Sequence, residues 1–116
     1  STRPWQHVLD VTFGYLTLAA QLKKNKKIHG EAFNFGPELD GSRTVEDVVK
    51  TALKSWPGEY HININNSAHY EANLLKLSID KAQSKLKWYP KWNFDMAIEK
   101  TMEWYKEHLL EWLFRM

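Results

Sequence analysis

The sequence predicts a mixed α/β fold, of the α+β kind, with about four helices and about three short strands in one domain. Apolar residues recur at helical spacing in four segments, while the short segments between them alternate in polarity or end at glycine and proline. The chain has 116 residues, of which 43% are apolar, so it has room for one modest core. A sheet of so few short strands is marginal as a free-standing unit, and we therefore expect a lobe that packs against something larger.

The first helix is expected between Val8 and Leu22, where apolar side chains recur every three to four residues. Asp10 is a plausible N-cap for it. Gly14 costs a helix up to about 1 kcal/mol relative to alanine, so we expect a neighbouring element to approach the helix backbone closely there. The basic run Lys23–Lys27 indicates the positively charged end of this helix, because lysines there complement the helix dipole. A nucleic-acid patch is the alternative interpretation, but no groove-reading or stacking motif accompanies it.

A short strand is expected over Ala32–Pro37, with its two phenylalanines on one face, followed by a polar loop. The next helix starts at Thr44, whose spacing to Asp47 approximates a capping box, and Pro57 stops it. The apolar stripe of this helix is formed by Val45, Val48, Val49, Ala52, Leu53 and Trp56.

The second half of the chain predicts two extended segments and two helices. Tyr60–Asn65 alternates in polarity like a half-buried strand, and Leu74–Ser78 is short and extended. Ser78 is expected to cap a brief helix, and Asn93 is expected to cap the last helix after an aromatic-rich turn. In the brief helix, Ile79, Ala82 and Leu86 are directed inwards. The apolar stripe of the last helix is formed by Phe94, Ala97, Ile98, Thr101, Tyr105, Leu109 and Trp112.

Composition narrows the functional classes. The net charge is only +2, so general polyanion binding is not implied, and without cysteine there are no disulfides and no thiolate metal sites. The five histidines show no ligand spacing, and no nucleophile motif, P-loop or glycine-rich cofactor loop is present, so we expect no catalytic, metal or cofactor-binding residue here. No apolar run approaches the ~20 residues of a membrane span, and no signal-peptide pattern occurs. We expect a cytoplasmic protein.

Ligand binding is the functional class that the composition and motifs leave open. Arg3 is the best candidate for a phosphate contact, because its planar guanidinium suits phosphate oxygens. A solvated arginine at a frayed chain end is an equally good interpretation of the residue taken alone.

Four stretches carry a family resemblance, in the same order along the chain. "RPWQHVLDVTFGYLTLAAQL" resembles the segment that opens the second lobe of the extended short-chain dehydrogenase/reductases that act on nucleotide sugars. "AFNFGP", "TVEDVVKTALKSW" and the closing segment from Glu71 to Lys106 are similar to later parts of the same lobe, although Lys87 stands where glycine is common. Within the family, "RPWQHV" looks like the branch of dehydratases that acts on CDP-glucose.

The resemblance implies that residues 1–116 are the C-terminal nucleotide-sugar-binding lobe of an NAD-dependent sugar-nucleotide 4,6-dehydratase. The NAD-binding Rossmann domain and its catalytic residues would be missing, so this piece would be inactive alone, with that domain as its partner and a homo-oligomer as a further expectation for the full-length protein. It also implies the substrate-binding residues. Arg3 matches the motif arginine and looks like a pyrophosphate ligand, Gln6 lies beside it, and Glu71 would face the ribose or base. Lys76 and Arg43 are weaker candidates for a second phosphate contact.

Two other hypotheses remain open. The chain could be the corresponding lobe of another nucleotide-sugar epimerase or dehydratase, which only the missing domain would decide. It could also be a stand-alone helical interaction module that docks through the apolar tail "HLLEWLFRM", with Trp112, Leu113 and Phe114 as anchors. A final helix that packs on the lobe itself is the simpler interpretation of that tail.

Overall fold

The computed structural model describes residues 1–63 and 75–115. Within them the fold is mixed α/β, as predicted, with four α-helices and one two-stranded antiparallel sheet. The elements are β1 (Thr2–Pro4), α1 (Val8–Lys24), β2 (Ser42–Thr44), α2 (Val45–Ser55), α3 (Asp80–Leu86) and α4 (Phe94–Arg115), with 3₁₀ turns at Lys26–Ile28 and Leu39–Gly41.

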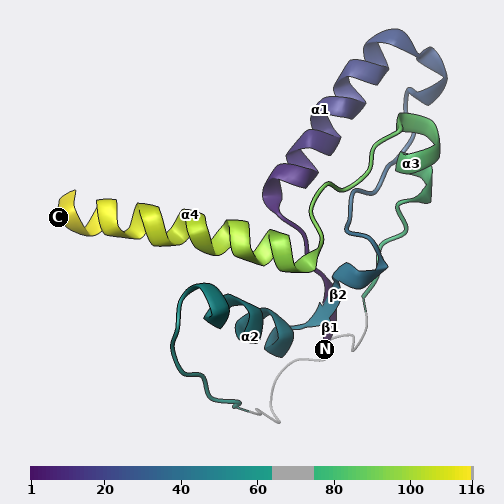
Figure 1. Ribbon diagram of the computed structural model, residues 1–116. Coiled ribbons are helices and arrows are strands. Elements are labelled where there is room, and N and C mark those ends of the chain that lie inside the picture. The colour runs from purple at the N-terminus through teal and green to yellow at the C-terminus, as the bar shows by residue number, and fades with distance from the viewer. Residues whose placement is uncertain (64–74, 116) are drawn as a thin grey trace.

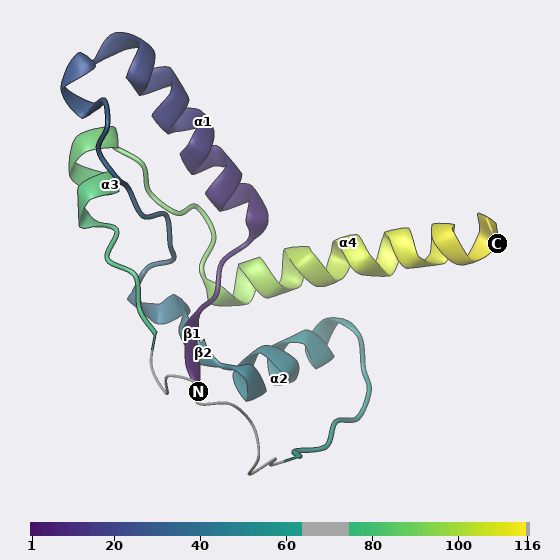
Figure 2. The same ribbon diagram turned by 180° about the vertical axis from the view of Figure 1, so that it is seen from behind.

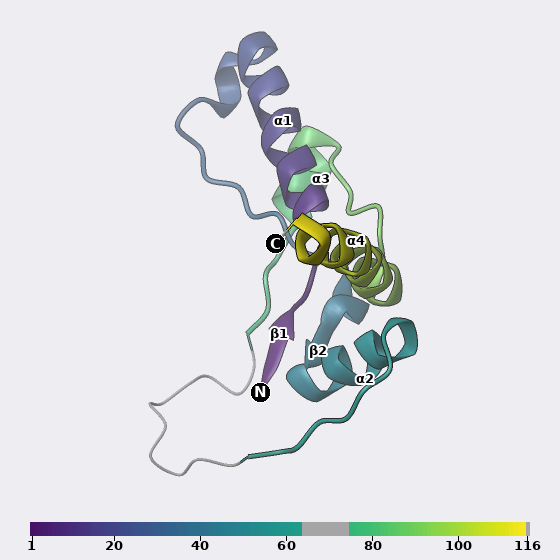
Figure 3. The ribbon, with the colours of Figure 1, turned by 90° about the vertical axis from the view of Figure 1, so that its left-hand side faces the viewer.

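The helices form two pairs that meet at the short sheet. α1 packs beside α3, and α2 packs beside α4, while β1 and β2 lie at the junction between the pairs (Figure 1). The opposite view shows the same arrangement, in which α4 projects past α2 at its C-terminal end (Figure 2). Seen along α4, α1 and α3 lie above this helix, whereas α2 and the two strands lie below it (Figure 3). Among the described residues, no helix combines the length and the apolar character needed to cross a membrane.

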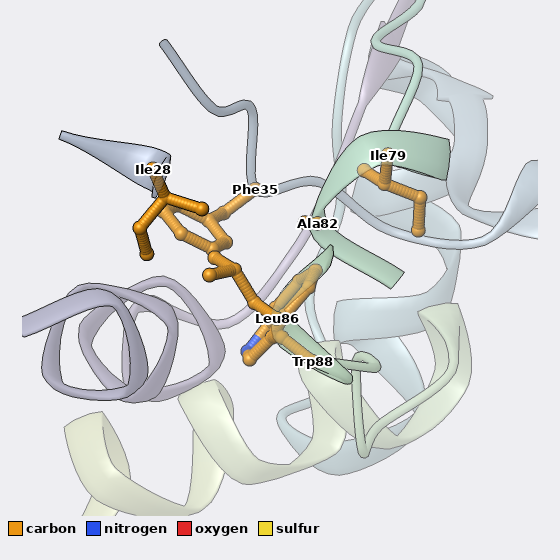
Figure 4. Packing of buried hydrophobic residues seen from close by; sticks show 6 residues of the cluster. All are labelled: Ile28, Phe35, Ile79, Ala82, Leu86 and Trp88. Carbon is orange, nitrogen blue, oxygen red and sulfur yellow. The ribbon is translucent and has the colours of Figure 1, made fainter. Parts of the chain in front are cut away.

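The buried core lies between α1 and α3. It consists of Ile28, Phe35, Ile79, Ala82, Leu86 and Trp88 (Figure 4). Leu86 and Trp88 are completely enclosed, and the ring of Phe35 meets Trp88 edge to face with centroids 5.0 Å apart. The prediction that Ile79, Ala82 and Leu86 face inwards is confirmed.

Gly14 explains how α1 reaches this core. A Cβ atom at position 14 would lie 2.5–2.9 Å from three carbons of the Phe35 ring, closer than real Cβ contacts come. The predicted close approach is therefore confirmed, and the group that needs the space is an aromatic side chain. Glycine at this position lets Phe35 lie directly against the helix backbone.

The predicted cap of α1 is wrong. The helix begins at Val8, and its N-cap is His7, whose ring Nδ1 accepts a hydrogen bond of 3.0 Å from the Leu9 backbone N–H. Asp10 lies inside the first turn and is buried, with only 4% of its surface exposed. Its carboxylate accepts hydrogen bonds from the backbone N–H groups of Lys91 (3.0 Å) and Trp92 (3.3 Å), so it joins α1 to the turn before α4.

Of the three other predicted caps, two are confirmed and one is wrong. Thr44 and Asp47 form a complete capping box at the start of α2, and Asn93 accepts a hydrogen bond of 2.9 Å from Met96 at the start of α4, both as predicted. The prediction for Ser78 is wrong, because Ile79 is the N-cap of α3 and no side chain caps that end. The apolar side chain of Ile79 is buried, and this burial holds the residue at the start of the helix instead.

The predicted strands are wrong where the structure describes them. Residues 32–37 are extended but form no ladder, since Phe35 is anchored by core packing. Tyr60–Asn63 is exposed and is not a strand, while the rest of that predicted strand lies outside the described residues. Leu75–Ser78 is not a strand either, although the Leu75 N–H donates to the Thr2 carbonyl at 3.1 Å beside β1.

Candidate functional site

The sheet brings two of the predicted binding residues together. In the antiparallel register of β1 and β2, Arg3 is paired directly with Arg43. Directly opposite residues in an antiparallel ladder have Cβ atoms about 5 Å apart on the same face. Two cationic side chains therefore start from one position of the ribbon, although many residues separate them in the sequence.

Trp5 fixes the register that pairs the arginines. Its indole Nε1–H donates to the Arg43 carbonyl at 2.8 Å, and its backbone N–H donates to the Gly41 carbonyl at 3.0 Å. These bonds extend the contact between β1 and β2 beyond three residues per strand. Sequence reasoning did not assign Trp5 a role, and only its place in the "RPW" motif pointed to it.

Both guanidinium groups are held by backbone carbonyls. An Nη atom of Arg3 donates to the Thr2 carbonyl at 2.9 Å, and Nε of Arg43 donates to the Asp40 carbonyl at 2.7 Å. The Arg43 guanidinium also lies over the ring of Phe94, 5.1 Å from its centroid, at the start of α4. Arg3 is half-buried and Arg43 is exposed, so the pair forms a partly ordered cationic surface.

The N-terminus of α2 adds a negative group beside this surface. Hydrogen bonds from the backbone and side chain of Thr44 hold the pKa of Asp47 below its usual range, and the nearby charge of Arg43 contributes a smaller effect in the same direction. Arg43 therefore interacts electrostatically with α2 as well as with the strand opposite.

The remaining predicted residues are more scattered. Gln6 donates from Nε2 to the Phe35 carbonyl at 2.7 Å, so its amide links the β1–α1 connection to the extended segment 32–37. Lys76 is exposed and follows Leu75, which bonds to β1 at Thr2. Glu71 lies outside the described residues. Binding by these three residues stays a prediction.

A cleft opens where α1 begins, beside the middle of α4. It has a volume of about 500 Å³ and is lined by Gln6, His7, Val8, Leu9, Thr101, Trp104 and Tyr105. Its walls are mainly apolar. The Oε1 atom of Gln6 is buried and has no hydrogen-bond partner among the described residues, which leaves an unsatisfied acceptor beside this cleft.

His7 and Asp10 fix the geometry of the cleft. The ring of His7 meets Trp92 edge to face with centroids 4.7 Å apart, in addition to capping α1. Because Asp10 binds the backbone of the same turn, the start of α1 and the start of α4 are held together at this corner.

The structure thus defines a small mixed α/β lobe whose only strand pair, within residues 1–63 and 75–115, carries two opposed arginines. No family model matches the sequence. The chain is 34% identical, over 107 residues, to the CDP-glucose 4,6-dehydratase of Salmonella typhimurium. This alignment covers 91% of the chain but 30% of the relative, so the chain spans about a third of that protein's length. The predicted resemblance to the nucleotide-sugar dehydratases is therefore confirmed, because the chain matches about a third of the length of one of them.

Proposed function

We propose that residues 1–116 are the nucleotide-sugar-binding part of a CDP-glucose 4,6-dehydratase, which forms CDP-4-dehydro-6-deoxyglucose. The Salmonella typhimurium relative is a CDP-glucose 4,6-dehydratase, which supports this substrate class. The observation that carries the proposal for this chain is the in-register pairing of Arg3 with Arg43. The catalytic residues would belong to the remaining two thirds of a protein of the relative's length, acting in the cytoplasm.

A diphosphate suits this arginine pair for electrostatic and geometric reasons. Like charges directly opposite on a ladder repel each other, and an anion placed between them removes that repulsion. Each guanidinium presents several N–H donors in one plane, which match the oxygens of neighbouring phosphates. Charge-assisted hydrogen bonds of this kind contribute about 1.5–3 kcal/mol each. In this proposal, the pair holds the diphosphate of the nucleotide sugar.

NAD belongs, in this proposal, to another part of the protein. The five glycines of the chain are at positions 14, 30, 36, 41 and 58, and they do not form a G-x-G-x-x-G motif. The described sheet is a two-stranded antiparallel ribbon, which is unlike the parallel sheet that binds dinucleotides. These residues do not fit NAD, so the role of this chain is to bind and orient the substrate.

The outer face of α1 is the surface that we assign, in this proposal, to contact with an NAD-binding domain of a longer protein. Leu9, Phe13 and Leu16 follow one another at helical spacing, and between 42% and 65% of their surfaces are exposed. The opposite face of the helix meets the core through Gly14, Leu18 and Leu22. An apolar stripe of this kind on a lobe that spans 30% of its relative is suited to an interdomain contact.

Calorimetric titration of the chain with CDP and with inorganic pyrophosphate tests the binding site. We expect Arg3→Ala and Arg43→Ala each to weaken both ligands at least tenfold, because each variant removes charge-assisted bonds. Arg115→Ala, which removes an arginine from the far end of α4, is the matched control and should leave both affinities unchanged. Equal binding by all four proteins would exclude the arginine pair as the diphosphate site.

A parallel titration with dTDP tests the base. A preference for CDP supports a CDP-glucose enzyme, because the two ligands share the same diphosphate. Equal affinities, together with loss of binding in Arg3→Ala, would support the diphosphate site and would contradict a cytidine-specific site within this chain.

A further inference from the structure

Trp5 makes two hydrogen bonds to the opposite strand and its turn, although it lies just beyond the end of β1. Its indole Nε1–H donates to the Arg43 carbonyl at 2.8 Å, and its backbone N–H donates to the Gly41 carbonyl at 3.0 Å. One bond reaches a residue within β2, and the other reaches the 3₁₀ turn directly before it. Together they fix the position of β1 along β2.

Gly41 lets the backbone of Trp5 lie against this turn. Gly41 is buried, and a Cβ atom there would clash with the Pro37 ring and lie 3.2 Å from the Trp5 carbonyl oxygen. A side chain at position 41 would therefore push the turn away from Trp5. The turn before β2 is thus shaped for the contact that sets the register.

The backbone ladder alone determines the register only weakly. β1 and β2 have three residues each, and Pro4 has no backbone N–H, so β1 offers its partner at most two backbone donors. The opposed side chains of Arg3 and Arg43 add repulsion rather than attraction. The bonds of Trp5 consequently supply a large part of the free energy that keeps the two arginines opposite each other.

The register decides whether both guanidinium groups can contact one ligand. Side chains alternate between the two faces of a strand, so a shift of β1 by one residue would move Arg3 to the face opposite that of Arg43. A diphosphate has two adjacent phosphate groups, and in the shifted register it would contact one arginine instead of two. A single phosphate needs one guanidinium group only, so the shift would affect its binding much less.

We propose that Trp5 is a specificity-determining residue, which selects a diphosphate over a single phosphate by holding Arg3 in register with Arg43. The inference rests on the proposed function, in which this pair binds the diphosphate of a nucleotide sugar. Trp5 contacts neither phosphate group in this arrangement. It is a positioning residue that acts through the Arg43 backbone.

A tryptophan that served only to pack against its neighbours would have a different effect. Loss of packing destabilises the folded chain, and both anions bind the same folded chain, so the two affinities would fall together. Loss of register lowers the affinity for the diphosphate selectively. The ratio of the two affinities therefore distinguishes positioning from packing.

Calorimetric titration with pyrophosphate and with inorganic phosphate measures this ratio. Trp5→Phe keeps an aromatic ring but removes the indole N–H, and we expect it to weaken pyrophosphate binding about fivefold, the factor that corresponds to one ordinary hydrogen bond. Phosphate binding should stay at the wild-type level. Trp112→Phe is the matched control, because Trp112 lies near the C-terminal end of α4, away from β1 and β2 (Figure 1). An unchanged affinity ratio in Trp5→Phe would overturn the proposal.

A disulfide that fixes the register gives the second test. Pro4 and Ser42 are directly paired, and the Cα atoms of such pairs lie about 4.5–5.5 Å apart, a distance that a disulfide spans. The chain has no other cysteine, so Pro4→Cys with Ser42→Cys introduces a single possible bridge. When oxidised in the Trp5→Phe background, this bridge should restore the wild-type affinity for pyrophosphate, and reduction should remove the gain. No recovery on oxidation would show that Trp5 acts other than through the register.

The inference and the proposed function can fail separately. Wild-type pyrophosphate affinity in both Arg3→Ala and Arg43→Ala would exclude the diphosphate site itself. Loss of affinity in both arginine variants, together with an unchanged ratio in Trp5→Phe, would leave the proposed function intact and overturn only the role of Trp5.

Discussion

Arg3 lies directly opposite Arg43 in the antiparallel pairing of β1 and β2. A two-stranded ribbon of three residues per strand has few interactions with which to offset the repulsion of two like charges. Trp5 nevertheless holds the register through the Arg43 carbonyl. In the proposed function, a bound diphosphate would lie against both guanidinium groups and offset their repulsion.

Pyrophosphate should stabilise the chain through this pair. A ligand that binds only the folded state raises the free energy of unfolding, by about 2.7 kcal/mol when its concentration is 100 times the dissociation constant. We expect Arg43→Gln to lose most of this stabilisation and Arg115→Gln to keep it. Thermal unfolding with and without pyrophosphate measures the effect. An equal rise in all three melting temperatures would indicate nonspecific anion binding.

Asp10 should be the polar residue of α1 whose loss destabilises the chain most. Its buried carboxylate accepts two backbone N–H groups, those of Lys91 and Trp92, and removing it leaves both donors unsatisfied. We expect Asp10→Ala to cost about 2–4 kcal/mol of unfolding free energy in urea, given about 1–3 kcal/mol for each unsatisfied group. Thr17→Ala, on the same helix, is the control and should change stability by less than about 1 kcal/mol.

Gly14→Ala should destabilise the chain although alanine is the better helix former. The gain in helix propensity is about 1 kcal/mol, whereas overpacking against the Phe35 ring costs about 1–3 kcal/mol. Phe35→Leu should cost stability alone, yet it should relieve the clash in the double variant. A double-mutant cycle from urea unfolding measures that coupling, and additive effects would contradict the close contact.

The helices could be predicted because their signals are local. Thr44 and Asp47 are three residues apart, and so are Asn93 and Met96, whose N–H donates to the Asn93 side chain. The local sequence around each of these caps therefore specifies the cap. Asp10 misled the prediction for a physical reason. A carboxylate near a helix start resembles a cap, but its partners are the N–H groups of residues 91 and 92, far along the chain.

The strands and the candidate site could not be predicted in the same way. β1 and β2 have three residues each and show no alternation, and their pairing joins positions 2–4 to positions 42–44. Phe35 made residues 32–37 resemble a strand, because burial in a core and burial in a sheet select the same side chains. The sequence therefore predicts Arg3 and Arg43 as separate candidates for phosphate contacts, and only the strand register shows that they are neighbours.

Lys87→Gly should stabilise the chain. Lys87 ends α3 in the left-handed conformation, with φ of 56°, and it donates from its backbone to the Gln83 carbonyl at 3.2 Å. A non-glycine residue in this region costs about 1–2 kcal/mol, so we expect a gain of about 1 kcal/mol in urea unfolding. Ser84→Gly, inside α3, should instead lose about 1 kcal/mol. Destabilisation by Lys87→Gly would show that this conformation is not strained.

The capping box of α2 should make stability depend on pH through Asp47. Hydrogen bonds from the Thr44 backbone N–H and hydroxyl lower the pKa of this carboxyl group below its ordinary value of 3.8. A group with a lowered folded-state pKa contributes stability above its unfolded pKa and loses it as the pH falls through the folded value. The difference in unfolding free energy between wild type and Asp47→Asn should therefore be constant near neutral pH and shrink below about pH 4.

Thr44→Ala separates this charge effect from capping in general. The largest cause of the lowered pKa is the Thr44 backbone N–H, which alanine retains, so this variant should keep most of the pH dependence. It should still lose about 0.5–2 kcal/mol at every pH, because the hydroxyl that accepts the Asp47 N–H is gone. Urea unfolding of the three proteins between pH 3 and pH 7 distinguishes the two contributions. A difference between wild type and Asp47→Asn that does not change with pH would mean that Asp47 acts without its charge.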